Sequence, residues 1–298
     1  MNAVATYLDD AFTESPSLEG RIHSCFEHAV NVEFSIGAEQ VLYTFAAELD
    51  AGIPDSIVLS PANLERVRQM ECGAPALKDG NAIMFPQAGL AVELGGRNCS
   101  NTFPLGCRLA SRQERQSRMD SICGSAFQGR EREGFAFLAA LGVEPESALQ
   151  LHAAKLFKSL ERGLEKHDLD ECEQVLRSLI GLGGGLTPSA DDVLLGMMAA
   201  FRFRKEAKSI NETRCEFIDA FSSAIVRLAD KRTTDVSRKY LRCAGQGRFS
   251  LPLLKSAMSF LDGGRAVDMR AVKRLAGAGR TSGIDMLAGL ALGIARMD

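Results

Sequence analysis

The chain has 298 residues, 46% of them hydrophobic and 24% charged, with a formal net charge of −3. This composition is that of a globular protein large enough for two domains. No apolar run reaches the roughly 18 residues that cross a bilayer, and residues 1–20 carry four acidic and no basic side chains, unlike a signal peptide. We therefore expect a cytoplasmic protein that does not enter membranes.

The charge is divided unevenly along the chain. Residues 1–105 hold 14 acidic and 5 basic side chains, so the remainder is mildly basic. A small positive excess suits a small anionic metabolite, while the lack of basic–aromatic clusters argues against nucleic acid as a partner. The eight cysteines include no C-x-x-C pair, which predicts reduced thiols rather than a zinc site.

The first part of the chain has the pattern of a β-rich domain. Residues 1–20 are expected to be a lead-in without regular structure. Alternating apolar residues at 32–36 and 41–45, on either side of Gly37, predict a hairpin. Further expected elements are a short strand at 56–59, a helix that begins at Ser60-Pro61, and strands at 82–85 and 90–94. Residues 1–107 are assigned to this domain.

After Pro104-Leu105-Gly106 the hydrophobic periodicity becomes helical. Helices are expected at 132–141, 146–166, 170–180, 212–229, 235–244, 251–262, 266–276 and 284–296. A further helix follows Asp192. The predicted fold class is α+β: a β-rich N-terminal domain, then a mostly α-helical C-terminal domain over residues 108–298 that carries two glycine-rich loop–helix units.

The first of these units lies between Gly181 and Asp192. It contains four glycines in five residues, which cannot form a helix or strand interior without a large entropic cost. The pattern predicts a loop that feeds a helix N-terminus, with Ser189 or Asp191 as the cap, and such a loop favours anion binding. No Gly-Lys-Ser/Thr follows, so it is not a Walker A loop. The alternative is a glycine-rich helix end followed by an ordinary capped helix.

The second unit lies near the C-terminus and repeats the order of the first. Gly279, Thr281, Ser282, Asp285 and Gly289 correspond to glycine, threonine, serine, aspartate and glycine of the first unit. We infer two similar units that pack near each other, with hydroxyls and carboxylates converging on one site. The alternative is a coincidence of residues that commonly cap helices.

A third group of hydroxyls, Thr233, Thr234 and Ser237, follows Lys231 and Arg232. Capping of the next helix could explain these residues. They could also hold an oxyanion.

These three motifs together resemble those of a bacterial domain-of-unknown-function family that includes the AllH-type subunit of oxamate carbamoyltransferase, from allantoin degradation. The motifs cover about the last 120 residues. One position departs from the family pattern, because Ala190 stands where the family usually has glycine. If that position requires a positive φ, Ala190 would be strained.

The resemblance implies reversible carbamoyl transfer between carbamoyl phosphate and oxamate, which gives oxalurate and phosphate. It also implies partner subunits in a carbamoyltransferase complex, one of them related to acyl-CoA synthetases, and the chain could itself form a homo-oligomer. Two other functions stay open: a Mg²⁺-dependent enzyme that handles phosphate, and a non-catalytic subunit that binds a metabolite.

The assignment of site residues comes from the chemistry of the reaction. The expected catalytic residues are Asp191, Asp192, Asp285, Thr187 and Ser189. The expected substrate- or phosphate-binding residues are Gly183, Gly184, Gly185, Thr233, Thr234, Ser237, Arg280, Thr281, Ser282 and Gly283. If Mg²⁺ binds, its ligands would be Asp192 and Asp285, and Arg280 is expected to offset their charge where no cation does.

Overall fold

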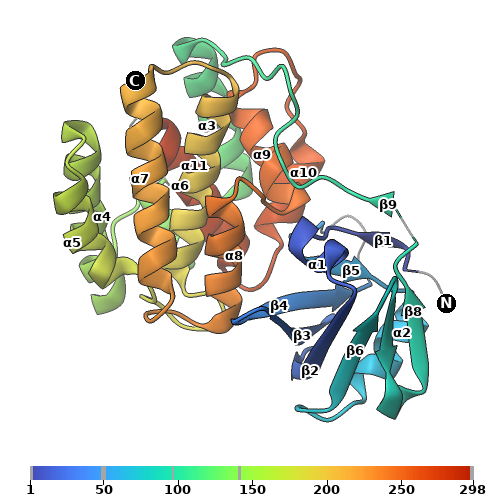
Figure 1. Ribbon diagram of the computed structural model, residues 1–298. Helices are drawn as coiled ribbons and strands as arrows, with labels where there is room; N and C mark the ends of the chain where they lie inside the picture. Colours follow the sequence, from blue (N-terminus) through green and yellow to red (C-terminus); the bar gives the residue numbers. More distant parts are fainter. Residues whose placement is uncertain (1–2, 48–51, 96, 140–141, 296–298) are drawn as a thin grey trace. The chain divides into compact units, whose positions relative to one another are not determined.

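The computed structural model describes residues 3–47, 52–95, 97–139 and 142–295. The chain divides into two compact units, Met1–Asn101 and Thr102–Asp298. The first is β-rich and the second helical, so the predicted α+β class is confirmed (Figure 1).

The described part of the N-terminal unit forms a nine-stranded sheet in the order β8-β7-β6-β2-β3-β4-β5-β1-β9. The strands are β1 Ala5–Thr6, β2 Ser17–Cys25, β3 Ala29–Ile36, β4 Glu39–Ala46, β5 Ser56–Val58, β6 Pro75–Asp79, β7 Ala82–Phe85, β8 Leu90–Glu93 and β9 Arg97–Asn98. The helices of this unit are α1 Asp10–Glu14, α2 Pro61–Arg68 and the 3₁₀ turn η2 Pro86–Ala88. The expected hairpin is confirmed as β3–β4, and Ser60 caps α2 as predicted.

Residues 1–20 are not an irregular lead-in, and that prediction was wrong. They contain β1, α1 and the start of β2. The five-residue α1 is held by tertiary packing, because its buried Phe12 lies against the rings of Phe34 and Tyr43 at 5.3 and 4.2 Å between centroids. A helix this short has no periodicity from which a sequence could predict it.

The helical unit contains α3 Arg112–Ala126, η3 Ala136–Leu138, α4 Ala148–Lys166, α5 Leu169–Leu179, α6 Ser189–Glu206, α7 Glu212–Ala229, α8 Asp235–Gly245, α9 Leu251–Leu261, α10 Met269–Ala276 and α11 Ser282–Ala295. Most of these agree with the expected helices. The helix expected at 132–141 is wrong, since only the 3₁₀ turn η3 forms in its described part. Gly134 has a φ of 49° there, which no right-handed helix contains.

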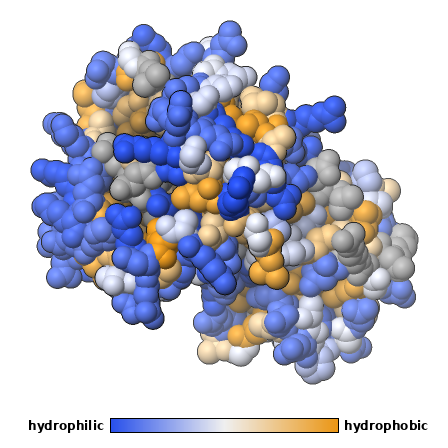
Figure 2. Space-filling view, turned by 90° about the horizontal axis from the view of Figure 1, so that it is seen from above, coloured by the Kyte–Doolittle hydropathy of each residue, from blue (hydrophilic) through white to orange (hydrophobic). Residues whose placement is uncertain are grey.

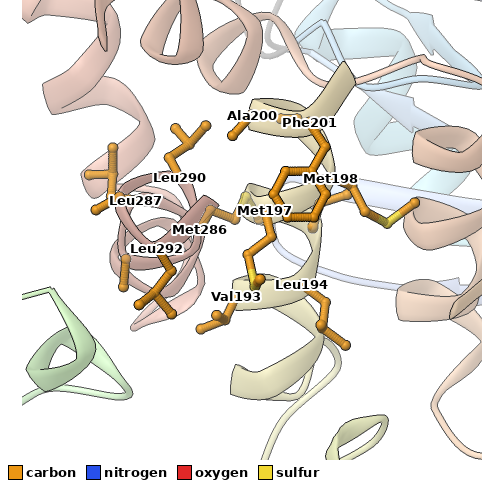
Figure 3. Packing of buried hydrophobic residues seen from close by; sticks show 14 of the residues in the cluster. Val193, Leu194, Met197, Met198, Ala200, Phe201, Met286, Leu287, Leu290 and Leu292 are labelled. Atoms are coloured by element: carbon orange, nitrogen blue, oxygen red, sulfur yellow. The ribbon is translucent and has the colours of Figure 1, made fainter. Parts of the chain in front are cut away.

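The centre of the helical unit is the pair α6 and α11, whose residues are nearly all buried (Figure 1). The helices touch through glycine. A Cβ on Gly196 would lie 2.1 Å from the carbonyl oxygen of Met286, and one on Gly289 would lie 1.9 Å from that of Val193. Figure 3 shows side chains of α6, such as Val193 and Met197, beside those of α11. This reciprocal contact brings the two loop–helix units together.

On the face shown in Figure 2, hydrophobic residues lie in small groups among hydrophilic ones. Among the described residues, the exposed large hydrophobic side chains are Val4, Leu105, Leu149, Leu151 and Leu186. No helix in the described ranges is both long enough and apolar enough to cross a membrane.

Candidate functional site

Both central helices begin at the same end of the pair. The hydroxyls of Thr187 and Ser282 lie 2.8 Å apart, which places the N-termini of α6 and α11 side by side. The positive ends of two helix dipoles therefore meet at one place, a position that favours negative charge in a ligand. The inference that the two units converge agrees with this geometry.

The glycine loop before α6 presents backbone donors that the protein does not use. Among the described residues, the N–H groups of 183–187 donate to no protein acceptor. Gly183 has a φ of 124°, and a Cβ there would lie 2.6 Å from the Ser189 nitrogen, so only glycine fits. Gly184 and Gly185 are exposed, with open space around them. The loop can thus present several N–H groups to one anion.

Asp191 holds this loop in place. Its Oδ1 accepts from the N–H of Gly181 at 2.8 Å, and its Oδ2 accepts from the hydroxyls of Ser237, at 2.6 Å, and Thr233. Burial raises the pKa of Asp191, and these three donors act to lower it. With both oxygens occupied by protein donors, Asp191 joins the glycine loop to the start of α8.

The three hydroxyls of residues 233, 234 and 237 also make hydrogen bonds within the protein. Thr233 and Ser237 direct their protons to Asp191, while Thr234 donates to the carbonyl oxygen of Leu186 and caps α8 by accepting from Ser237 N at 3.1 Å. In this arrangement the three hydroxyls position the loop. Their predicted contact with a ligand stays a prediction.

Asp192 and Asp285 differ from Asp191, because each keeps a buried oxygen without a partner. Their exposed fractions are 2% and 0%, and their Oδ2 atoms accept no hydrogen bond from the described residues. The hydroxyls of Ser282 and Thr187 lie against Asp192, and those of Ser189 and Thr281 against Asp285. Each aspartate is thus flanked by one hydroxyl of its own unit and one of the other.

Burial also controls the protonation of this pair. It raises the pKa of Asp192 well above its usual range, and the negative charges of Asp285 and Asp191 add to the effect. Burial raises the pKa of Asp285 to about 7, against the lowering effects of the Phe135 N–H, two hydroxyls and the positive charge of Arg130. Perturbed carboxyl groups with orphaned oxygens are typical of functional sites.

The sequence did not indicate the segment that covers Asp285. The N–H of Phe135 donates to Asp285 Oδ1 at 2.6 Å, and a Cβ on Gly134 would lie 2.3 Å from that oxygen. Arg130 donates to the carbonyl oxygens of Ala276 and Arg280, at 2.7 and 2.5 Å, and so lies beside the α11 loop. Nothing in the spacing around Gly134 relates it to a motif 150 residues away.

The predicted role of Arg280 stays a prediction. Its side chain is exposed and makes no ion pair among those found in the described ranges. The cation that acts on Asp285 is Arg130. Gly283 has a packing reason to be glycine: a Cβ there would lie 1.6 Å from the Leu275 carbonyl oxygen, so glycine is needed for packing of α11 on α10. Its predicted contact with a ligand stays a prediction.

The start of α6 corrects two further expectations. Neither Ser189 nor Asp191 is the N-cap, because that position is Pro188 and the helix begins at Ser189. Ala190 lies in the first helical turn and is not among the described residues with positive φ. Alanine is therefore accommodated there without backbone strain.

Tyr240, on α8, is a further neighbour of this site that the sequence did not indicate. Burial raises its pKa, and so does the negative charge of Asp192. The only available signal was its position three residues after Ser237, on the same helix face.

For metal binding, the described residues contain no group of three or more His, Cys, Asp or Glu side chains arranged to hold an ion. Asp192 and Asp285 still have the chemistry of a Mg²⁺ site, since Mg²⁺ is commonly held by one or two carboxylates together with water and substrate phosphate.

Comparison with solved structures finds no match to this chain. Two protein-family models do match it. The family described as oxamate carbamoyltransferase subunit AllH matches residues 179–294, which include both loop–helix units, and the AllH family N-terminal domain matches residues 3–101. The second range covers the N-terminal unit and the first covers the part of the helical unit from the end of α5 onward, so the chain belongs to the AllH family.

Proposed function

We propose that this chain is the subunit of an oxamate carbamoyltransferase-type enzyme that binds carbamoyl phosphate and oxamate where α6 and α11 begin. The single observation that carries the proposal is the pairing of unused N–H donors in residues 183–187 with the orphaned buried oxygens of Asp192 and Asp285. The reaction belongs to nitrogen catabolism of purines and allantoin. It yields oxalurate and phosphate in the direction that consumes carbamoyl phosphate, and it forms carbamoyl phosphate and oxamate in reverse.

The phosphate of carbamoyl phosphate fits the glycine loop. Backbone N–H groups and hydroxyls at two helix N-termini offer donors to its oxygens and positive dipole ends to its charge. Two ionised carboxylates beside a phosphate dianion would oppose binding. The raised pKa values of Asp192 and Asp285 reduce that repulsion, because they favour the neutral forms. A Mg²⁺ ion between the carboxylates and phosphate would do the same.

Carbamoyl transfer then needs a base for the acceptor nitrogen. The amide nitrogen of oxamate attacks the carbamoyl carbon, the new C–N bond forms, and the C–O bond to phosphate breaks with its electron pair leaving on phosphate. The attacking nitrogen loses one proton. Asp285, with a pKa of about 7, is suited to accept it near neutral pH.

The word "subunit" in the family description supports an assembly with other chains. We infer that partner subunits complete or cover the site, and that the chain supplies the phosphate-binding half. Two alternative functions remain. One is a Mg²⁺-dependent enzyme that handles phosphate, which the paired orphaned carboxylates favour. The other is a subunit that binds the metabolite without catalysis.

Calorimetric titration tests this proposal. The full chain is titrated with carbamoyl phosphate, oxalurate and ADP, with and without Mg²⁺, as wild type and as Asp192→Asn and Thr187→Val. Asp170→Asn, at an exposed aspartate of α5, is the matched control. We expect saturable binding of carbamoyl phosphate that both site variants weaken and the control does not.

Other outcomes separate the alternatives. Binding of ADP alone, and only with Mg²⁺, would favour the phosphate enzyme. Tight binding of carbamoyl phosphate without turnover, even when partner subunits are co-expressed, would favour the non-catalytic role. If Asp192→Asn lowers the melting temperature and leaves binding intact, the aspartate is structural and the proposal is wrong.

A further inference from the structure

Residues 130–135, the segment that covers Asp285, form neither helix nor strand, so contacts outside the segment must hold it in place. The segment ends at Phe135, whose N–H donates to Asp285 Oδ1 at 2.6 Å. A Cβ on Gly134 would lie 2.3 Å from Oδ1 and 2.8 Å from Oδ2, so bare backbone lies against the whole carboxyl group. The position of this segment therefore decides which oxygen of Asp285 is left for a ligand.

Helix α4 holds the covering segment at two points. The Nε2 of Gln150 donates to the carbonyl oxygens of Gly134, at 2.9 Å, and Arg132, at 3.1 Å. The ring of Phe135 lies edge-on to that of Phe157, with 6.2 Å between centroids. Gln150 and Phe157 are seven residues apart in α4, which places them on one face of the helix. That face thus binds the segment through both its backbone and its ring.

Gln150 has a second task, which can be separated from the first. Its Oε1 accepts from the N–H groups of Glu146 and Ser147 at 3.0 and 3.3 Å, and the Ser147 hydroxyl accepts from Gln150 N at 3.1 Å. This is the capping box of α4. A capping box uses only the acceptor oxygen of the glutamine, and glutamate serves equally well. The two N–H donors of Gln150 are therefore additional to the cap, and both go to the covering segment.

The hydrogen bond from Phe135 makes the two oxygens of Asp285 unequal. The carbonyl oxygen of a carboxylic acid is a better acceptor than its hydroxyl oxygen, so a donor on Oδ1 directs any proton of the group to Oδ2. When the group is ionised, Oδ1 is still occupied and Oδ2 is still without a donor among the described residues. In either state Oδ2 is the oxygen that remains for a ligand.

We propose that Gln150 is a positioning residue of this site, which ties residues 130–135 to α4. The tie keeps the Phe135 N–H on Asp285 Oδ1, so that Oδ2 is the oxygen that meets the acceptor nitrogen of the substrate. This inference rests on the proposed function, and it names the reacting oxygen and the residue that orients it. Gln150 acts on the substrate through the covering segment.

The consequence of losing the tie follows from population arithmetic. Without the two donors of Gln150, the segment spends part of its time in positions where the Phe135 N–H has left Oδ1. A ligand that needs the ordered segment then binds more weakly, by the fraction of molecules in which the segment is in place. Two hydrogen bonds of ordinary strength set the scale of this loss at roughly tenfold. Phosphate bound by the N–H groups of residues 183–187 does not need the segment.

Calorimetric titration of the full chain with two ligands tests the proposal. Oxalurate contains the acceptor nitrogen already joined to the carbamoyl group, and inorganic phosphate contains neither. Gln150→Glu keeps the capping oxygen and removes both donors to the covering segment. It should weaken oxalurate by roughly tenfold and leave phosphate affinity and the melting temperature close to wild type. Gln174→Glu, which makes the same charge change at an exposed position of α5, should alter neither affinity.

Two further measurements distinguish positioning of Asp285 from a general structural role. In the ligand-free chain, hydrogen exchange of the Phe135 amide should become roughly tenfold faster in Gln150→Glu, while the amides of α4 exchange as in wild type. In an Asp285→Ala background, Gln150→Glu should weaken oxalurate no further, because the carboxyl group through which it acts is absent. The exchange measurement needs no substitution at Asp285, so it stands even if that variant does not fold.

The outcomes distinguish this inference from the proposed function. Wild type that binds both ligands, with oxalurate affinity or Phe135 exchange unchanged by Gln150→Glu, would show that Gln150 does not position the site, and the phosphate site would stand. The same conclusion follows if Gln150→Glu weakens phosphate as much as oxalurate, or acts fully in the Asp285→Ala background. If wild type does not bind oxalurate, the proposed function is wrong and the positioning role falls with it.

Discussion

The contact between α6 and α11 can be tested by one methyl group. Gly289 lies in the interior of α11, where alanine would ordinarily stabilise the helix by about 1 kcal/mol. A Cβ at this position would lie 1.9 Å from the Val193 carbonyl oxygen, 2.7 Å from its carbonyl carbon and 2.9 Å from its Cα. Real Cβ atoms essentially never approach closer than 3.0 Å, so Gly289→Ala requires the helices to separate by about 1 Å.

The expected cost follows from the atoms involved. Overpacking in a core costs about 1–3 kcal/mol, and here the contacted atoms are backbone of α6 that cannot rotate away. The upper end of that range, less the gain in helix propensity, leaves a net destabilisation of about 2 kcal/mol. For a unit of this size, that lowers the melting temperature by roughly 4–8 °C.

Scanning calorimetry measures the shift, and hydrogen exchange of α6 and α11 amides locates it. The matched control is Gly124→Ala in α3, where no atom lies within 4 Å of the added Cβ. That change should stabilise the protein by about 0.5–1 kcal/mol, opposite in sign. A Gly289→Ala protein as stable as wild type would refute the backbone contact, and with it the convergence of the two units.

Three further predictions concern the site itself. Asp191→Ala should destabilise the helical unit by a few kcal/mol, because it leaves three donors unpaired. Denaturant titration measures this loss, and unchanged stability would show that the hydrogen bonds of Asp191 are not needed to hold the glycine loop. Burial raises the pKa of Asp285 from 3.8 to about 7, so between those pH values the folded state holds a proton that the unfolded state releases, and stability falls as pH rises. The free energy of unfolding of Asp285→Asn, relative to wild type, should therefore increase across that window and level off above it; a flat difference contradicts the raised pKa. Gly134→Ala, at a φ of 49° and with a Cβ 2.3 Å from Asp285 Oδ1, should weaken carbamoyl phosphate binding in calorimetry, whereas Gly129→Ala, at a φ of 76° with open space around it, should leave binding as in wild type.

Much of the fold could be predicted because local patterns and tertiary packing agree. The alternation around Gly37 gives β3 and β4, and Ser60 followed by proline gives the start of α2. The failures are places where packing alone decides. The helix α1 forms because Phe12 fits between two rings, and no helix forms at 132–141 because Gly134 turns the chain toward Asp285.

The site divides in the same way. The similarity of the two loop–helix units is visible in the sequence because the same glycines and aspartates recur at nearly the same spacing. Their different roles are not visible, since Asp191 and Asp192 are adjacent and chemically identical. Only the hydrogen bonds show that Asp191 is fully occupied by protein donors while Asp192 keeps a buried oxygen free of them.

The contrast between these adjacent aspartates is itself an argument for a ligand. A buried acceptor without a donor costs about 1–3 kcal/mol, and folding alone offers no reason to keep two such oxygens, on Asp192 and Asp285, when Asp191 shows that hydroxyls and N–H groups nearby can satisfy a carboxylate completely. The glycines of α6 and α11 bring the two oxygens to one end of the core, where unused N–H groups also gather. Unsatisfied donors and unsatisfied acceptors at one place are complementary to a ligand that carries both, and a phosphorylated primary amide is such a ligand.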